Sequence, residues 1–154
     1  MQLRRATMDD ALDVLDWRND ETTRKNSFNQ EEISKESHLN WFKRKLEDNN
    51  CLMYILEDET GSLGSIRLDV TDRIGEISYM IAPHKRGKGL GKEIIRLIDN
   101  VPEVRDSKSV NSIQSLVGFV NEDNVASARC FEENGYTKLI AGDIRCYIKN
   151  LWSE

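Results

Sequence analysis

A glycine-rich segment with two basic residues, RGKGLG at residues 86–91, is the part of the sequence best suited to bind an anion. The apolar residues 76–82 before it predict a strand, and apolar side chains at helical spacing in residues 92–98 predict a helix. The first N–H groups of a helix have no partner within it, and glycine lets a phosphate approach that backbone closely. We therefore expect a phosphate site here, to which Arg86 and Lys88 add positive charge.

Two common phosphate-binding motifs do not match this segment. A P-loop has four residues between its first glycine and Gly-Lys, whereas three separate Gly87 from Gly91 here, and Glu93 stands where Ser or Thr is needed. The dinucleotide fingerprint has glycines at its first, third and sixth positions, whereas here they fall at residues 87, 89 and 91. Neither a P-loop nor a Rossmann dinucleotide site is therefore expected.

A second motif lies further along the chain, in VGFVNEDNVASARCFEENGY at residues 117–136. A valine-rich strand is followed by Asn-x-x-Asn-x-x-Ser and by a helix that ends before Gly135, as helices often do at glycine. Together with the Arg-x-x-Gly-x-Gly pattern of residues 86–91, this motif resembles the GCN5-related N-acetyltransferases, the GNAT superfamily. Both motifs stand in that family's order and at about its spacing, so the resemblance covers nearly the whole chain.

Length and composition limit the classes of protein to which the chain can belong. Its 154 residues predict one domain, 1–154, with 38% hydrophobic and 32% charged residues. The net charge of −5 argues against a general nucleic-acid binder, which needs a basic surface. The three cysteines and two histidines form no metal-ligand pattern, and neither a signal peptide nor a run of about 18 apolar residues occurs. We therefore expect a soluble cytoplasmic protein without a metal ion, a nucleic-acid partner or a membrane span.

The order of predicted elements fits an α/β fold of the α+β type. We expect strands at residues 2–6, 51–57, 63–70, 76–82, 113–120, 136–141 and 144–148. Helices are expected after Thr7, after Ser34 or Ser37, at 92–98 and at 125–134, with residues 21–30 as a loop and 105–111 as a polar connection. The resemblance implies a GNAT fold, in which a mixed, mostly antiparallel, twisted sheet of about seven strands is flanked by about four helices and splays between its fourth and fifth strands. Exposed strand edges at residues 51–57 or 144–148 would allow either a monomer or a homodimer.

The resemblance also implies that acetyl-CoA is the cofactor and that its pantetheine arm lies between the fourth and fifth strands. There it would pair with the backbone of Ile81 and Ala82 as an added strand does. The pyrophosphate would contact Arg86 and the N–H groups of Gly87, Lys88, Gly89, Leu90 and Gly91. Three polar side chains would lie near the cofactor, with the second as a direct pantetheine contact: Asn121, Asn124 and Ser127. Each of the three could instead cap the following helix, and both roles are compatible.

The implied chemistry is direct attack of a primary amine on the acetyl thioester in a ternary complex. The backbone N–H of Ile81 would stabilise the oxyanion, and Glu76 would take the amine proton directly or through water. Glu76 could equally be an exposed strand carboxylate, because its position alone does not make it a base. Many relatives have a tyrosine as general acid where this chain has Phe131, which cannot donate a proton. The acid is left unassigned, with three distant alternatives: Tyr79, Tyr136 and Cys130.

The N-terminal part of the chain resembles one GNAT branch, the bacterial aminosugar N-acetyltransferases of the pseudaminic-acid pathway. The residues that carry this likeness are Trp17-Arg18-Asn19, Arg24, Ser27 and His38-x-x-Trp41-Phe42. The resemblance implies a small-molecule amine as acceptor, a nucleotide-linked 4-amino-4,6-dideoxy sugar. Arg18 and Arg24 would hold its phosphate, and His38 would contact the sugar or take a proton. The aromatic residues could instead belong to the core, and His38 could be a structural group.

Other functions stay open at this point. Ribosomal-protein and other protein N-terminal acetyltransferases share the Asn-x-x-Ser pattern, but a peptide acceptor would favour an open groove with an acidic rim. Arg18, Arg24 and Arg67 favour the sugar nucleotide instead. Phe131 is also compatible with a non-catalytic acyl-CoA-binding module, whereas the second motif argues against a structural domain that only binds phosphate.

Overall fold

Seven strands form one sheet in the computed structural model, which describes residues 1–105 and 113–151. The strand order is β1-β2-β3-β4-β5-β7-β6, and neighbours run antiparallel except for the parallel pair β4 and β5. The strands are β1 (Gln2–Arg5), β2 (Cys51–Asp58), β3 (Gly61–Thr71), β4 (Ile74–Ile81), β5 (Ser115–Asn121), β6 (Thr137–Ala141) and β7 (Ile144–Asn150). The predicted mixed, mostly antiparallel sheet is therefore confirmed.

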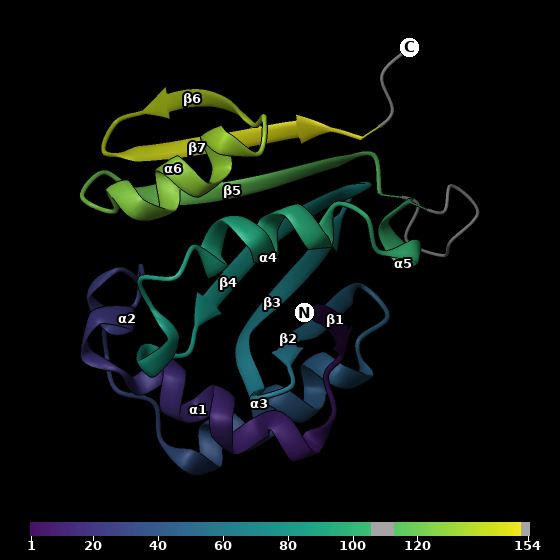
Figure 1. Cartoon of the computed structure of the whole chain (residues 1–154), viewed down its shortest axis with the longest axis vertical. Coiled ribbons are helices and arrows are strands. Elements are labelled where there is room, and N and C mark those ends of the chain that lie inside the picture. Colours follow the sequence, from purple (N-terminus) through teal and green to yellow (C-terminus); the bar gives the residue numbers. More distant parts are fainter. Residues whose placement is uncertain (106–112, 152–154) are drawn as a thin grey trace.

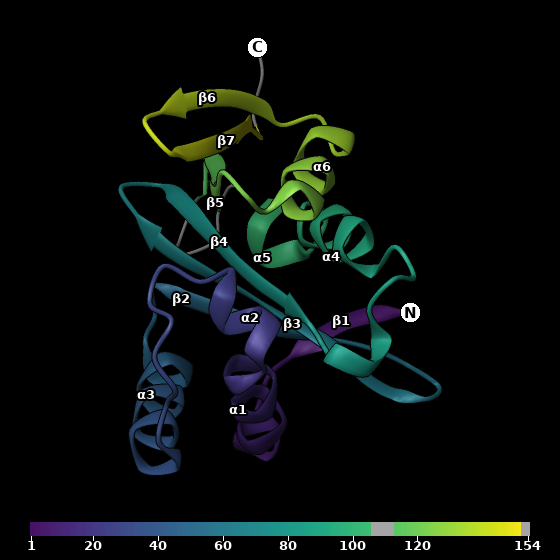
Figure 2. The same cartoon turned by 90° about the vertical axis from the view of Figure 1, so that its left-hand side faces the viewer.

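Helices cover both faces of this sheet. Figures 1 and 2 show α1 and α3 on one face, with α2 beside α1, and α4 and α6 on the other. The α-helices are α1 (Ala11–Asn19), α2 (Glu21–Lys25), α3 (Lys35–Glu47), α4 (Leu90–Ile98), α5 (Pro102–Arg105) and α6 (Val125–Glu133). Single 3₁₀ turns, Met8–Asp10 and Pro83–Lys85, precede α1 and the glycine-rich loop.

The interior strand β2 shows why the sheet carries helices on both sides. Its side chains alternate between two cores, since Leu52 and Leu56 pack toward α4 while Met53 and Ile55 pack toward α1 and α3. All four are buried. Because both faces of this strand are apolar, the sheet exposes neither face here and helices must cover both.

β4 and β5 pair over a short stretch and then separate. Parallel pairing joins residues 74–76 to residues 115–117, and the described residues form no β4–β5 pair beyond this point. β4 nevertheless continues to Ile81 and β5 to Asn121, so their facing backbone groups have no strand partner across the gap. The predicted splay between the fourth and fifth strands is confirmed.

Two short helices add to the four that the sequence predicts. Residues 21–30 are expected to be a loop, but residues Glu21–Lys25 form α2. The missed indicator is Asp20, whose Oδ2 accepts the backbone N–H of Thr23 at 3.2 Å and so caps this helix. α5 begins at Pro102, a residue suited to the first helical position because its missing N–H would be unpaired there anyway.

The free edges of the sheet are not where the sequence predicts them. β2 lies between β1 and β3, and β7 lies between β5 and β6, so the outer strands are β1 and β6. The expectation of exposed edges at residues 51–57 or 144–148 is therefore wrong. Most of the polar connection expected at 105–111 lies outside the described residues. Within the described part of the chain, no helix has both the length and the apolar character needed to cross a membrane.

Candidate functional site

The glycine-rich loop enters α4 through two residues with left-handed backbone conformation. Gly87 has a φ of +79°, and Gly89, the N-cap of α4, has a φ of +76°, a region that residues with side chains rarely adopt. No heavy atom lies within 4 Å of a Cβ built on either glycine. The space above the loop is therefore open to a ligand, and α4 presents its unpaired N–H groups and positive dipole end to it. This geometry is suited to a pyrophosphate group.

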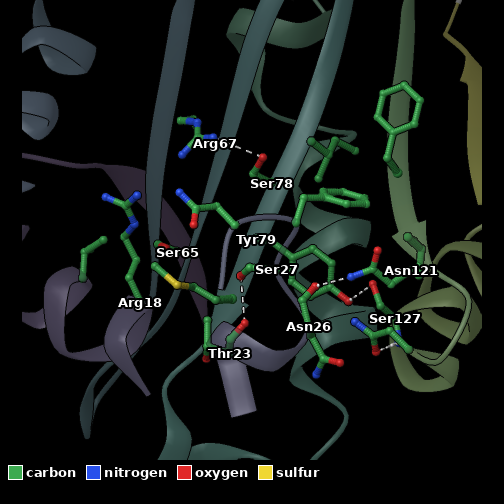
Figure 3. Close-up of a pocket in the computed structure, with 18 of the residues that line it drawn as sticks. Arg18, Thr23, Asn26, Ser27, Ser65, Arg67, Ser78, Tyr79, Asn121 and Ser127 are labelled. Atoms are coloured by element: carbon green, nitrogen blue, oxygen red, sulfur yellow. Dashed lines mark hydrogen bonds between the residues drawn. The ribbon is translucent and has the colours of Figure 1, made fainter. Parts of the chain in front are cut away.

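Two hollows meet at β4. The first, which we call the loop groove, has a volume of about 670 Å³ and runs along the glycine-rich loop and the first turns of α4 and α6. The second, the helix-side cavity, has a volume of about 380 Å³ and lies among α1, the segment after α2, and strands β3, β4 and β5 (Figure 3). Tyr79, Met80, Asn124 and Ser127 line both hollows. A ligand in one can therefore reach a ligand in the other through the gap between β4 and β5.

The pairing of β3 and β4 determines which backbone groups of β4 face this gap. The N–H of Ala82 donates to the Leu63 carbonyl, and the N–H of Lys85 donates to the Ala82 carbonyl, both at 2.8 Å. Hydrogen-bonded positions alternate along an antiparallel pair, so the backbone groups of Tyr79 and Ile81 face away from β3, toward β5. Ile81 therefore has an N–H directed at the gap. Ala82, by contrast, is fully buried, and both its backbone polar groups are hydrogen-bonded within the fold.

The three predicted polar side chains of the second motif all line the helix-side cavity. Asn124 caps α6, since its Oδ1 accepts the N–H of Ser127 at 3.2 Å. Asn121 donates from Nδ2 to the carbonyl of Asn26 at 3.1 Å, which fastens the segment after α2 to the end of β5. The Ser127 hydroxyl accepts a hydrogen bond from the Tyr79 hydroxyl at 2.9 Å. The capping role that the sequence allows for Asn124 is thus present, and its side chain still borders both hollows.

The two basic residues of the loop are placed differently. Arg86 lines the loop groove, and its Nη2 donates to Asp20 Oδ2 at 2.7 Å and to Thr23 Oγ1 at 2.8 Å. The hydrogen bond from Arg86 lowers the pKa of the Asp20 carboxyl below its usual value. Lys88 is exposed and is not among the described residues that line either hollow. Of the two, Arg86 is the charge that the structure places at the groove, and it joins the loop to the start of α2.

His38 of α3 is a structural residue. Its side chain is fully buried, its Nε2 donates to the Ala11 carbonyl at 2.6 Å, and its Nδ1 accepts from Arg18 Nη1 at 3.0 Å. A carbonyl oxygen can only accept, so Nε2 carries the hydrogen and the ring is neutral. Burial, together with the charge of Arg18, lowers the pKa of His38. Both ring nitrogens of His38 are thus used within the fold, where they help to orient Arg18, and His38 is not among the described residues that line either hollow.

Two arginines lie against Trp41 at the cavity wall. The guanidinium carbon of Arg18 lies 4.1 Å from the centroid of a Trp41 ring, and that of Arg67 lies 5.0 Å from it. Arg67 also donates to Asp69 Oδ2 at 2.8 Å and to the Ser78 hydroxyl at 3.2 Å. Burial, with a contribution from the charge of Arg67, lowers the pKa of Arg18 to about 10. The sequence names Arg67 only as a positive charge and does not predict this cluster, because its members come from α1, α3 and β3.

Two further predicted residues lie away from both hollows. Arg24 is on α2, and Glu76 is on the part of β4 that still pairs with β5, where it stands opposite Val117. Neither is among the described lining residues, and Glu76 is exposed. Glu76 thus lies in the structure as an exposed strand carboxylate, one of the two roles that the sequence leaves open, and Arg24 is not among the residues that line the cavity. Of the predicted aromatic residues, Trp17 and Phe42 are buried in the core.

Comparison with known proteins identifies the family. A family model described as an acetyltransferase (GNAT) domain matches residues 1–137. Spermidine N-acetyltransferase from Vibrio cholerae, solved with CoA and spermine, has a TM-score of 0.84 at 18% identity over 97% of this chain and 95% of that chain. Ribosomal-protein-alanine N-acetyltransferase from Brucella melitensis gives 0.77 at 19% identity over 97% and 99%. An N-acetyltransferase from Staphylococcus aureus Mu50 gives 0.80 at 17% identity over 98% of each chain.

These structural similarities, at identities below 25%, establish the shared fold, whereas the family match establishes membership. No curated protein matches the sequence. The open glycine loop at the N-terminus of α4 and the gap between β4 and β5 are consistent with the acetyl-CoA on which the acetyltransferases of this family depend. The chain belongs to the GNAT family and is an N-acetyltransferase with acetyl-CoA as its acetyl donor.

Proposed function

We propose that this enzyme acetylates the primary amine of a small acceptor that occupies the helix-side cavity, by direct attack in a ternary complex. The observation that carries the proposal is that the loop groove and the helix-side cavity meet at Tyr79 and Met80. An acetyl donor held by Arg86 and by the N–H groups of residues 87–91 would thereby lie beside an acceptor in the cavity. Two reactants held side by side in this way need no covalent enzyme intermediate.

Backbone geometry supports the role of Ile81 in this reaction. Its N–H is directed at the gap between β4 and β5, and Ile81 lines the loop groove. An N–H fixed by a strand needs no rearrangement as negative charge develops on the acetyl oxygen, which is the property that makes such donors effective. We assign no side chain as the base: Glu76 lies outside both hollows, and the amine releases its proton to water.

The charges of the cavity wall indicate the kind of amine. Arg18 and Arg67 lie on the same tryptophan, and only Arg67 of the two makes an ion pair with a described carboxylate, Asp69. Glu31 is the one carboxylate among the described lining residues. A polycation would be repelled by such a wall, whereas a phosphate or carboxylate on the acceptor would relieve the repulsion between the two guanidinium groups.

A nucleotide-linked 4-amino-4,6-dideoxy sugar has this combination of a primary amine and phosphate charge. Trp41 is half-buried at the wall, and Phe28 and Phe119 at the cavity are 61% and 44% exposed, so flat apolar surface is available for a sugar or base. The Vibrio cholerae relative was solved with spermine, a polycation, and the arginines argue that this chain takes a different acceptor. We also propose a cytoplasmic location, with which the three free cysteines are consistent.

The test is release of free CoA thiol from acetyl-CoA in the presence of a panel of amines. The panel pairs the nucleotide-linked 4-amino sugar with the same amino sugar lacking its nucleotide, and adds spermidine, amino acids and peptides with free N-termini. We expect the nucleotide-linked sugar to have the highest kcat/KM and spermidine the lowest. Preference for the peptides would instead support protein N-terminal acetylation, and acetyl-CoA binding without turnover on any amine would support a binding module; either result contradicts the proposal.

A further inference from the structure

Tyr79 places a hydroxyl group at the junction of the two hollows. It lies on β4, lines both the loop groove and the helix-side cavity, and donates from its hydroxyl to Ser127 Oγ at 2.9 Å (Figure 3). A Cβ built on Gly91, in the first turn of α4, would lie 3.7 Å from the Tyr79 hydroxyl oxygen and 3.0 Å from Cys130 Sγ. The hydroxyl therefore stands between the glycine-rich loop and the start of α6, on the side of the gap where the donor's thioester must pass.

The helix of the second motif, α6, cannot supply this hydroxyl itself. Phe131 stacks on Tyr147 with ring centroids 5.5 Å apart and meets Tyr79 edge-on at 6.1 Å. A Cβ built on Gly118 would lie 2.3 Å from Phe131 Cζ, so the para end of the ring packs directly on the backbone of β5. There is no room for a hydroxyl at that end of the ring without displacing the strand.

The remaining described tyrosines are also unsuitable. Tyr147 is fully buried and donates to Glu132 Oε1 at 3.1 Å, and Tyr54 and Tyr136 are buried in the core. None of the three lines either hollow. Cys130 lines the loop groove, but its thiol is a weak donor beside a phenol that is already hydrogen-bonded. Tyr79 is thus the described tyrosine that lines both hollows.

We propose that Tyr79 is a catalytic residue, the acid that protonates the CoA sulfur as it departs; this inference rests on the proposed acetyl transfer. The amine nitrogen bonds to the acetyl carbonyl carbon, the C–S bond breaks with its electron pair going to sulfur, and the sulfur takes the proton of the Tyr79 hydroxyl. The tyrosinate then recovers a proton through Ser127 from the water that received the amine proton. Amine and thioester thereby become amide and thiol, with no further reactant.

The surroundings of Tyr79 keep it in the form that this role requires. Burial raises the pKa of Tyr79 above its usual value, and the neighbouring Cys130 acts in the same direction. At neutral pH the phenol is protonated, as a tyrosine with its ordinary pKa also is, and it therefore carries a hydrogen to donate. Ser127, in the first turn of α6, can accept the phenol's hydrogen or donate its own, so it can pass a proton on without moving.

The experiment compares single-turnover acetyl transfer by the wild-type enzyme and by Tyr79→Phe, using the amine with the highest kcat/KM in the panel. The substitution removes one oxygen and keeps the ring. We expect the rate of the chemical step to fall about 100-fold while the Kd for acetyl-CoA changes less than about twofold, since a positioned acid typically contributes 10²–10⁴-fold. The matched control is Tyr147→Phe, which removes a buried hydroxyl from the same aromatic cluster but outside both hollows and should leave the rate unchanged.

A second measurement separates an acid from a merely structural hydroxyl. In an oxygen-ester analogue of acetyl-CoA the leaving group is an alkoxide, which is much more basic than a thiolate and depends more strongly on a proton donor. We expect the ratio of wild-type to Tyr79→Phe rates to be at least about 10-fold larger with this analogue. Ser127→Ala, which keeps the phenol but removes its partner, should lower the rate by about 3- to 10-fold.

The outcomes distinguish the role of Tyr79 from the proposed acetyl transfer itself. Equal single-turnover rates for the wild-type enzyme and Tyr79→Phe, or a ratio that does not rise with the oxygen ester, would overturn the role of Tyr79 alone. Failure of the wild-type enzyme to release thiol with any amine would overturn the proposed acceptor chemistry, and the role of Tyr79 with it.

Discussion

The loop groove and the helix-side cavity meet at one strand but are built by different means. The groove presents backbone N–H groups that follow one another in residues 87–91, so a single short segment makes its proposed anion site. The cavity is walled by side chains from several elements, among them Arg18 of α1, Trp41 of α3 and Arg67 of β3. A site made of consecutive backbone can be recognised from residue spacing, whereas a cluster of side chains depends on how distant elements pack.

The largest expected effect follows from filling the groove while sparing the cavity. Gly89→Trp puts a large side chain where the backbone is left-handed, at a φ of +76°, and where the space above it is open for a ligand. We expect the Kd for acetyl-CoA to rise at least about 100-fold, because both the strained backbone and the indole displace the phosphate. Isothermal titration of acetyl-CoA into the variant measures this.

Gly142→Trp is the matched control for backbone strain. Gly142 has a φ of +63° in the turn between β6 and β7, with no heavy atom within 4 Å of a Cβ built on it, and it lines neither hollow. The Gly142→Trp variant should lose about as much stability as Gly89→Trp but bind acetyl-CoA with the affinity of the wild-type enzyme. Equal affinity of Gly89→Trp and the wild-type enzyme for acetyl-CoA would show that the phosphates bind elsewhere.

The reverse experiment weakens acceptor binding in the helix-side cavity and leaves the loop groove unchanged. Arg67→Met removes one of the two guanidinium groups on Trp41 and keeps a long apolar side chain. We expect the KM for the anionic amine to rise about 10- to 100-fold, because a charged hydrogen bond is worth about 1.5–3 kcal/mol, with the Kd for acetyl-CoA unchanged. Steady-state kinetics with each substrate varied in turn provide the measurement.

The control for lost charge is Arg44→Met, on the exposed part of α3. It removes the same charge from the molecule without touching either hollow, and should leave both constants unchanged. If Arg67→Met affected the anionic amine and its uncharged counterpart equally, Arg67 would be a packing residue and the anionic acceptor would be refuted.

A smaller effect concerns Phe131 of α6, which lines the helix-side cavity. Phe131→Tyr would add a hydroxyl to a ring whose para carbon already packs on Gly118 of β5. We expect the free energy of unfolding to fall by about 1–3 kcal/mol, the usual cost of overpacking, without any gain in acetyl transfer. Urea denaturation together with the thiol-release assay decides the point: a faster and equally stable variant would mean that this ring, and not Tyr79, is the natural position for the acid.

The smallest effect concerns the residue that orients Arg18. Folded His38 has a pKa below its ordinary value of about 6.5, so the unfolded chain binds more protons and stability must fall as pH falls below that value. Between pH 7.5 and 5.5 this loss is at most about 1.4 kcal/mol. It should be visible as a difference in urea denaturation between the wild-type enzyme and His38→Gln, whose amide can replace both hydrogen bonds and does not titrate.

Identical pH dependence of stability in the two proteins would show that His38 is not held neutral in the folded state. The carboxyl groups of Asp10, Asp20 and Asp69 also have lowered pKa values. Their contribution to the free energy of unfolding is lost mainly at more acidic pH, because carboxyl groups are protonated there. Their contribution is common to both proteins and cancels in the comparison.

The same contrast explains what the sequence could and could not predict. Strand and helix patterns are local, so the sheet, the glycine-rich turn into α4 and the cap of α6 by Asn124 can be recognised from residue order. The direction of the backbone groups at residues 81 and 82 depends on the register of β3 and β4, so the sequence alone does not separate Ile81 from Ala82. The outer positions of β1 and β6 likewise depend on strand order, which no single segment encodes.

Side-chain roles at the acceptor end were harder to predict for a physical reason. An arginine or histidine on a helix can face a cavity or the core, and only tertiary packing decides which, as the buried His38 and the cavity-lining Arg18 show. Arg24 on α2 and Glu76 on the paired part of β4 lie outside the described lining of both hollows, which their positions in the sequence do not reveal. In the sequence, Tyr79 is one residue of an ordinary strand pattern, and only the fold places its hydroxyl at the junction of the two hollows.

The most direct test of the account is the affinity of a conjugate in which the amine of the nucleotide-linked 4-amino sugar is joined through an acetyl linker to the sulfur of CoA. If the two hollows meet as described, isothermal titration should show the conjugate binding at least about 100-fold more tightly than CoA, because one molecule then fills both sites. Arg67→Met should remove much of that gain. A conjugate that binds no better than CoA would contradict the claim that donor and acceptor sites meet at β4.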